Sequence, residues 1–147
     1  MDLVTSSDAV DVQQFLEDFA ANLNTNKLTS ATQFCLLPSI IIDDHSKTVL
    51  NSHADIEKVY KQFVDGLNSQ GIVKFVPEVK QTMRLSERLL FATIRWHLYD
   101  HSEQLRMSGS SSYTLQKMPD QQFKIIITVI DDSNKELEKI FPFNKRA

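Results

Sequence analysis

Hydrogen-bonding side chains are concentrated in one ten-residue segment of the sequence, FATIRWHLYD at residues 91–100. Arginine, histidine and tyrosine can orient a substrate or move a proton, so the segment is a candidate wall of an active site. Its β-branched and aromatic residues predict a strand, in which successive side chains point to opposite faces. Alternation gives an apolar set, Leu90, Ala92, Ile94, Trp96 and Leu98, and a mixed set, Phe91, Thr93, Arg95, His97 and Tyr99. Patterning alone places the apolar set in the core and the mixed set outside.

Metal binding and cysteine chemistry are not indicated by the remaining candidates. His97 and His101 are four residues apart, a spacing that brings two ligands together on a helix but not on a strand that runs into a turn. His45 and His53 are isolated in the sequence. Cys35 is the single cysteine, and in a predicted helix it reads as a small buried apolar residue. We therefore expect no metal and no cofactor.

Composition excludes several classes of function. The chain has three glycines, which are too few and too scattered for a phosphate-binding loop or a dinucleotide fingerprint. A net charge of −3 without a basic stripe argues against nucleic acid as a partner. The segment MDLVTSSDAV lacks the basic and apolar regions of a secretory signal, and no apolar run is long enough to span a membrane. We expect a cytoplasmic protein that contacts no membrane.

Hydrophobic periodicity predicts the helices that position these residues. The first helix carries the apolar stripe Val12, Phe15, Leu16, Phe19, Ala20 and Leu23. A second helix is expected at 29–36, before Pro38, followed by a short strand at 39–43 and a turn at 43–46. Ser52 is expected to cap a third helix. That helix carries the stripe Ile56, Val59, Tyr60, Phe63, Val64 and Leu67.

The second half of the sequence is expected to form strands. Their predicted ranges are 72–83, 89–99, 104–117 and 122–131, and the short turns between them indicate an antiparallel meander. Helices followed by strands indicate an α+β fold. The length fits one domain, which we place at residues 1–132. Residues 133–147 are expected to be a C-terminal extension with a short helix, because Leu137, Ile140 and Phe141 form a small apolar stripe.

This order of elements resembles the nuclear transport factor two-like superfamily, with PSIIIDD at 38–44, RWHLYD at 95–100 and KIIITVIDD at 124–132 as the local patterns. The SnoaL-like and ketosteroid-isomerase-like members are the most similar. The resemblance implies a curved antiparallel sheet wrapped around the N-terminal helix to form a conical pocket, a cystatin-like roll. It also implies a homodimer packed through the outer face of the sheet. Activities in the superfamily include isomerisation, cyclisation and hydrolysis of small apolar molecules.

The resemblance assigns candidate catalytic residues. Asp43 matches the position of the proton-abstracting carboxylate in the isomerase branch, while its other reading is a turn-forming aspartate. The register of the superfamily turns the mixed face of strand 89–99 inward. Arg95 and His97 would then line the pocket beside Tyr113, whose phenol would donate to a carbonyl oxygen that gains negative charge. The Trp96 face would be the dimer contact.

The ligand-binding wall is expected to contain Phe15, Phe19, Tyr60, Phe63 and Thr93. Two departures from the superfamily affect its mechanisms. The first helix offers Phe15 and Phe19 where the isomerases carry a tyrosine donor. Ile130 replaces the last-strand aspartate of the hydrolase-like branch. Neither known mechanism therefore transfers complete.

The sequence is compatible with two functions. The first is a pocket protein that binds a small apolar substrate and catalyses proton transfer, with Asp43 as base, Arg95 and Tyr113 stabilising negative charge, and His97 shuttling a proton. The second is a non-catalytic dimeric interaction or scaffold module whose pocket is filled. A cavity smaller than about 300 Å³ favours the second function. The sequence identifies no substrate and leaves open whether the protein is an enzyme.

Overall fold

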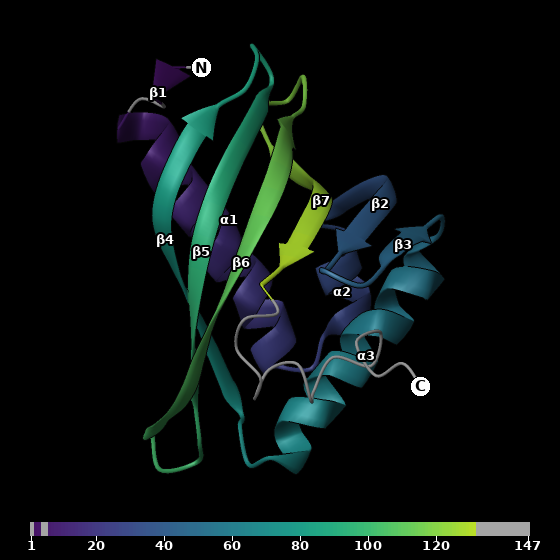
Figure 1. Ribbon diagram of the computed structural model, residues 1–147, viewed down its shortest axis with the longest axis vertical. Helices are drawn as coiled ribbons and strands as arrows, with labels where there is room; N and C mark the ends of the chain where they lie inside the picture. The colour runs from purple at the N-terminus through teal and green to yellow at the C-terminus, as the bar shows by residue number, and fades with distance from the viewer. Residues whose placement is uncertain (1, 4–5, 132–147) are drawn as a thin grey trace.

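The computed structural model describes residues 2–3 and 6–131, and within them seven strands form one sheet in the order β1–β4–β5–β6–β7–β2–β3. The strands are β1 Asp2–Leu3, β2 Cys35–Ile42, β3 Lys47–Leu50, β4 Lys74–Arg84, β5 Leu89–Tyr99, β6 Leu105–Lys117 and β7 Phe123–Ile130. The helices are α1 Ser6–Asn24, α2 Leu28–Thr32 and α3 His53–Ser69. The sheet is curved and does not close, and α1 crosses behind β4, β5 and β6 (Figure 1).

The predicted α+β fold and the predicted meander are confirmed. Strands β4, β5, β6 and β7 pair with one another in sequence order, and every pair is antiparallel. The sheet as a whole is not purely antiparallel, because β2 joins it parallel to β7. A β3 strand that the sequence did not predict extends the sheet by pairing antiparallel with β2. The helix predicted in the extension, residues 133–147, lies outside the described residues.

The second helix is shorter and the strand after it is longer than predicted. Helix α2 ends at Thr32, and β2 begins at Cys35. The chain leaves the helix early because the N–H of Ile125 on β7 donates to the carbonyl of Phe34 at 2.8 Å. This partner is distant in sequence, so local periodicity could not reveal it. The pairing of β2 with β7 is irregular between Cys35 and Ile40, a stretch that contains Pro38 and its missing N–H donor.

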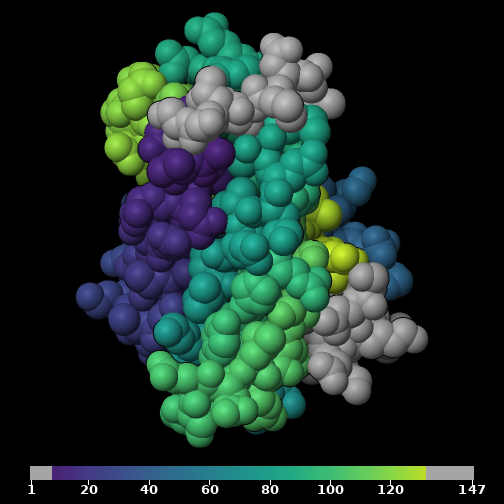
Figure 2. All heavy atoms as spheres, turned by 90° about the vertical axis from the view of Figure 1, so that its left-hand side faces the viewer, coloured from purple at the N-terminus to yellow at the C-terminus, as the bar shows by residue number. Residues whose placement is uncertain are grey.

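Two amide side chains of α1 bind the backbone of β4. Gln13 donates from Nε2 to the Pro77 carbonyl at 3.0 Å and accepts from the Val79 N–H at 2.9 Å. Asn24 donates to the Phe75 carbonyl at 3.0 Å and accepts from the Phe75 N–H at 2.7 Å. Strand β1 pairs with β4 at Met83 and Arg84, the far end of that strand. Nearer its start, the two amides make hydrogen bonds to the β4 backbone that a neighbouring strand would otherwise make. The space-filling view shows α1 in purple directly alongside β4 in teal (Figure 2).

The hydrophobic core lies between the helices and the inner face of the sheet. Helix α1 contributes its predicted stripe, of which Val12 and Leu16 are fully buried. Helix α3 begins as predicted, because the hydroxyl of Ser52 accepts a hydrogen bond from the Asp55 N–H at 3.1 Å. Strand β5 turns its apolar set inward, and Leu90, Ala92, Ile94 and Leu98 are at most 3% exposed. The core therefore forms on the face that carries Trp96.

Candidate functional site

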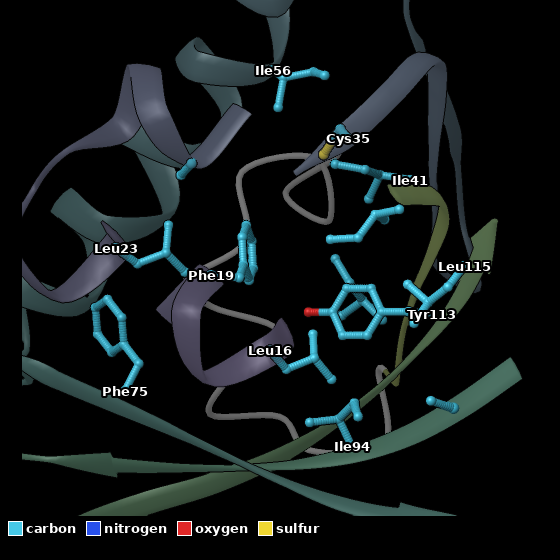
Figure 3. Packing of buried hydrophobic residues seen from close by; sticks show 14 of the residues in the cluster. Leu16, Phe19, Leu23, Cys35, Ile41, Ile56, Phe75, Ile94, Tyr113 and Leu115 are labelled. Carbon is cyan, nitrogen blue, oxygen red and sulfur yellow. The ribbon is translucent and has the colours of Figure 1, made fainter. Parts of the chain in front are cut away.

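A cavity of about 80 Å³ lies within the core, between α1, α3 and the inner face of the sheet. Its walls are mostly apolar and aromatic. The residues that line it are Phe19, Leu23, Ile41, Val59, Tyr60, Phe63, Phe75, Trp96, Leu98, Gly109, Ser110, Ser111, Tyr113, Thr128 and Ile130. Three of the predicted wall residues, Phe19, Tyr60 and Phe63, are among them. The phenol oxygen of Tyr113 points away from its strand into the space that Phe19 faces (Figure 3).

Strand register brings Trp96 and Tyr113 to the same face. Trp96 on β5 is directly opposite Gly109 on β6, and Ala92 is opposite Tyr113. Residues opposite one another in an antiparallel pair share a face of the sheet, and so do residues two apart on one strand. Tyr113 therefore faces inward as predicted, but it does so together with Trp96 and on the face opposite His97.

Trp96, Ser111 and Tyr113 form a polar group within the apolar wall. The indole Nε1–H of Trp96 donates to the Ser111 hydroxyl at 3.0 Å. Tyr113 is 6% exposed, and this burial raises the pKa of its phenol, while hydrogen bonds from Ser111 and Trp96 lower it in part. Since the charged form is disfavoured, the phenol stays neutral and remains a hydrogen-bond donor at neutral pH.

A second polar pair includes Tyr60 of the cavity wall. The thiol of Cys35 on β2 and the phenol oxygen of Tyr60 on α3 are 3.1 Å apart. Burial raises the pKa of the Tyr60 phenol well above its ordinary value, and the neighbouring Cys35 and Tyr113 raise it further. Burial also raises the pKa of the Cys35 thiol, although hydrogen bonds from Tyr60 and Ser39 oppose this shift. A thiol held neutral is a poor nucleophile, so the pair orients the phenol and does not attack a substrate.

Sequence reasoning missed the contact of Cys35 with Tyr60. Cys35 was expected on a helix, where it would be one apolar residue among others. Its place on β2, directly opposite Ile125 on β7, turns the thiol toward the core. Only the parallel pairing of β2 with β7 reveals this orientation, and no local pattern of the sequence encodes it.

The prediction that Arg95, His97 and Thr93 face the pocket is wrong. These residues lie on the outer face of the sheet, opposite the cavity, and Arg95 is exposed. His97 Nε2 is 2.9 Å from Glu78 Oε1 on β4, and its Nδ1 is 3.3 Å from the Ser108 hydroxyl on β6. The hydrogen bond to His97 and the nearby charge of Lys80 lower the pKa of Glu78.

The physical reason for this error is burial of apolar surface. The set of five that contains Trp96 is apolar throughout, and packing it against the helices removes more apolar area from water than packing the mixed set. The apolar pattern alone predicted that the Trp96 face of β5 packs inward. The register inferred from the resemblance predicted the opposite face instead. The predicted dimer contact through the Trp96 face is wrong for the same reason, since that face lines the cavity.

Asp43 is a turn-forming aspartate, the second of its two predicted roles, and it does not line the cavity. Its carboxylate accepts the N–H groups of His45 and Ser46, each at 2.7 Å, and the Ser46 hydroxyl at 3.0 and 3.1 Å. These bonds close the turn between β2 and β3, where the Asp43 N–H also donates to the Ser46 carbonyl. The residue is 6% exposed and is not among the residues that line the inner cavity.

Phe15 lines a different hollow. Its ring packs on Phe34 and Phe123, with centroids 5.4 and 6.0 Å apart. Together these rings border an open hollow of about 570 Å³ that is rimmed by polar residues of α1 and of the turn between β6 and β7. The residues predicted to form one ligand-binding wall therefore line two different hollows. Phe19, Tyr60 and Phe63 line the inner cavity, and Phe15 lines the hollow at the surface.

Among residues 2–3 and 6–131, no group of three or more histidine, cysteine or acidic side chains is placed to hold a metal ion. In the same part of the chain, no helix has the length and apolar character needed to cross a membrane.

Comparison with protein families places this chain in a known class. A family of NTF2-like proteins (DUF6841) matches residues 8–133. The chain belongs to this family, which confirms the resemblance to the nuclear transport factor two-like superfamily. A comparison with curated proteins finds no match.

Solved structures share the fold at low sequence identity. An NTF-2 like protein of unknown function from Shewanella oneidensis is 18% identical, with 84% of this chain and 98% of that chain covered and a TM-score of 0.66. A cystatin-like domain of unknown function from Nostoc punctiforme is 13% identical, with coverage of 98% and 90% and a TM-score of 0.67. A Catenulispora acidiphila protein in complex with S-DNPA is 8% identical, with coverage of 90% and 98% and a TM-score of 0.66. These similarities show the cystatin-like, NTF2-like fold.

Proposed function

We propose that this protein binds a small, neutral, mostly apolar molecule in the cavity between α1, α3 and the inner face of the sheet. The observation that carries the proposal is the set of neutral hydroxyl groups beside unfilled space in an otherwise apolar wall. A well-packed core has few voids, and hydroxyl groups within it are normally used up by partners. Tyr60 is paired with Cys35 and Ser111 accepts from Trp96, but these hydroxyls and that of Tyr113 also border the cavity, where a ligand could meet their remaining hydrogen-bonding capacity.

The size of the cavity limits the ligand. Drug-sized molecules occupy sites of about 300–1,000 Å³, and this cavity measures about 80 Å³. We therefore propose a ligand of a few heavy atoms, such as a small cyclic or aromatic compound. A neighbour of the same fold, the Catenulispora acidiphila protein, is in complex with S-DNPA, and this supports a ligand-binding use of the fold.

The proposal does not include proton transfer by Asp43. A general base must come within hydrogen-bond reach of the proton that it removes, about 2.6–3.2 Å. Asp43 is not among the residues that line the cavity, and its carboxylate holds the turn between β2 and β3. His97 and Arg95 lie on the other face of the sheet. The residues proposed for binding are Phe19, Tyr60, Phe63, Trp96 and Tyr113.

Trp96 provides a direct test, because it is the only tryptophan of the chain and lines the cavity. An amide spectrum of ¹⁵N-labelled protein contains one indole cross-peak, so its assignment is immediate. Titration with cyclopentanone, toluene or benzaldehyde should move this peak saturably. Val59→Phe, which places a ring at the cavity wall, should abolish the shift, while Val10→Phe on the exposed surface should preserve it. A cross-peak that none of the three probes moves would contradict the proposal.

A second function is favoured by a different observation, the apolar outer face of β3, β2 and β7. Register places five apolar residues together on this face: Ile40, Ile42, Val49, Ile127 and Val129. Val49 is 54% exposed and Val129 is 37% exposed. The small cavity also favours this second function. We propose that this face mediates homodimerisation, as an interaction module requires.

Light scattering after gel filtration tests the dimer. Val129→Glu should convert a dimer of the full chain into a monomer, because a carboxylate cannot be buried unpaired at an apolar contact. Val10→Glu, an exposed valine on α1, should leave the dimer intact. A wild-type chain that is monomeric at micromolar concentration would rule out this function.

A further inference from the structure

The open hollow beside Phe15 is large enough to be a binding site in its own right. It measures about 570 Å³, which lies within the range of about 300–1,000 Å³ that drug-sized molecules occupy. Among the described residues, none lines both this hollow and the inner cavity. A ligand of the hollow is therefore recognised by a different set of side chains.

Three phenylalanine rings form the apolar part of the hollow. Phe15 of α1 packs on Phe34 and Phe123, with ring centroids 5.4 and 6.0 Å apart. Phe34 also packs on Phe19 of the core, with centroids 5.6 Å apart, and Phe123 is 5% exposed. These contacts hold the rings in place, while Phe15 and Phe34 remain half-buried. A flat apolar group finds aromatic partners here.

Helix α1 adds negative charge beside these rings. The spacing i, i+3, i+4 and i+7 places four lining residues on one face of the helix: Asp11, Gln14, Phe15 and Asp18. Asp11 and Asp18 are exposed, about one turn before and one turn after Phe15. The Gln14 amide donates to Asp18 Oδ1 at 2.9 Å and so orients this carboxylate at the rim.

The turn between β6 and β7 supplies a third carboxylate on an ordered loop. Asp120 Oδ1 accepts the Gln122 N–H at 2.9 Å. The Met118 N–H donates to the Gln122 carbonyl, and the Gln121 N–H donates to the Met118 carbonyl, each at 2.8 Å. The turn is therefore fixed by its own hydrogen bonds, and the charge of Asp120 stays at the rim of the hollow.

The lining of the hollow carries a net negative charge. Its described residues include three carboxylates, Asp11, Asp18 and Asp120, and one ammonium, Lys124, which leaves a net formal charge of −2. The Lys124 ammonium donates to the Gln33 carbonyl, so the backbone holds it in place. Opposite charges attract and like charges repel, so the rim favours a cation and disfavours an anion.

One of the three rings already contacts a cation of the chain. Lys117 Nζ lies 5.9 Å from the centroid of the Phe123 ring, a distance at which the ring attracts a positive charge. The same ammonium is 3.4 Å from Asp8 Oδ1. An aromatic ring and a carboxylate thus hold this cation together. The hollow combines the same two kinds of partner.

We infer that the hollow binds an organic cation with a flat aromatic body, in particular an aromatic amidinium or guanidinium compound. The rings of Phe15 and Phe34 contact the body. The rim carboxylates attract the charged end, whose planar N–H groups match the two oxygens of a carboxylate. This site goes beyond the proposed function, because both its ligand class and its residues differ from those of the inner cavity.

Three probes of nearly equal shape and different charge test this site: benzamidinium, benzamide and benzoate. Their dissociation constants are measured on the ¹⁵N-labelled full chain from the backbone amide cross-peaks of Gln121 and Gln122, which line the hollow. Benzamidinium should bind at least about threefold more tightly than benzamide, and benzoate more weakly than either. Added sodium chloride should weaken the binding of benzamidinium and not that of benzamide. The indole cross-peak of Trp96 should not move, because Trp96 lines the inner cavity.

Matched variants separate the charge of the rim from the rings. Asp18→Asn and Asp120→Asn should each weaken benzamidinium binding about two- to fivefold and spare benzamide. The asparagine oxygen can still accept the bonds from Gln14 and Gln122, so the local structure is kept. Asp65→Asn on α3 removes the same charge from an exposed aspartate outside the lining and should affect neither probe. Phe15→Leu should weaken both probes.

Several results would overturn the inference. Equal binding of benzamidinium and benzamide would remove the role of charge, and so would equal losses in Asp18→Asn and Asp65→Asn. Cross-peaks of Gln121 and Gln122 that no probe moves would show that the hollow does not take this class of ligand. Cross-peaks that move only with protein concentration would show that a second copy of the chain covers it. The function proposed for the inner cavity stands in each case, because its test uses neutral probes and the Trp96 signal.

Discussion

Cys35 on β2 and Tyr60 on α3 join a strand and a helix through one contact of 3.1 Å between thiol and phenol, although 25 residues separate them in sequence. The contact lies beside the inner cavity, because Tyr60 is part of the cavity wall. Burial keeps both groups neutral, so the contact is a hydrogen bond between uncharged partners. It holds the phenol in place without adding charge to the apolar wall.

The contribution of this contact to stability can be measured with a double-mutant cycle. Cys35→Ala leaves the Tyr60 hydroxyl without its partner and should lower the free energy of unfolding by about 1–3 kcal/mol. Tyr60→Phe removes the other partner, and the two effects should not add, with a coupling of about 0.5–1.5 kcal/mol. Urea unfolding of the wild type, both single variants and the double variant gives these values. Strict additivity would show that the contact contributes nothing.

Alkaline pH should destabilise the fold. The pKa values of Tyr60, Tyr113 and Cys35 are raised in the folded state, so the folded chain keeps protons that the unfolded chain releases. The free energy of unfolding should therefore be unaffected by these groups at neutral pH. It should fall as pH rises through the ordinary values of 9.0 for the thiol and 10.0 for the phenols.

The size of this alkaline loss identifies the groups responsible. Urea unfolding at about pH 8 and about pH 10.5 should show a smaller loss of stability in Tyr60→Phe and in Tyr113→Phe than in the wild type. Each phenylalanine variant lacks a group that would have to ionise when the chain unfolds. An equal loss in all three proteins would mean that neither phenol is held neutral by the fold.

The amide of Asn24 should be important for the attachment of α1 to β4. The Asn24 side chain bonds to both the carbonyl and the N–H of Phe75. Asn24→Ala therefore leaves these two backbone groups of β4 without their hydrogen bonds. We expect a loss of about 1–3 kcal/mol in the free energy of unfolding. Asn22→Ala is the matched control, because the side-chain amide of Asn22 donates to the Asp18 carbonyl of its own helix. Equal losses in the two variants would contradict a specific role for Asn24.

Neighbouring residues of β5 should differ in their effect on ligand binding. Trp96→Phe should weaken binding of cyclopentanone, because Trp96 lines the cavity and donates to Ser111. His97→Ala should leave binding unchanged, because His97 is on the outer face with Glu78. Calorimetry is the suitable measurement, since it does not depend on the indole signal. Loss of binding in His97→Ala with retention in Trp96→Phe would restore the register inferred from the resemblance.

Much of the fold could be predicted because it is encoded in local patterns. The stripe from Val12 to Leu23 and the capping of α3 by Ser52 each depend on residues within a few positions of one another. The features that could not be predicted depend on distant partners. Strand β2 begins at Cys35 because of β7, and β3 exists because it pairs with β2.

The candidate site shows the same division. Tyr60 and Phe63 could be placed at the cavity, since helical periodicity turns them toward the core. Asp43 was open to two readings from its sequence, and the hydrogen bonds of the turn decide between them. The orientation of β5 depended on weighing apolar burial against family register. Apolar burial decides it, and the site is therefore built around Trp96 and Tyr113.

The central claim, that the inner cavity binds a small neutral molecule, is tested most directly by diffraction from a crystal of the full chain exposed to bromocyclopentane. The anomalous signal of bromine locates the probe without reference to any assumed pose. The account predicts a peak enclosed by Phe19, Trp96 and Tyr113, and its loss in Val59→Phe. Bromine found only in the outer hollow beside Phe15, or only on the outer face beside His97, would contradict it.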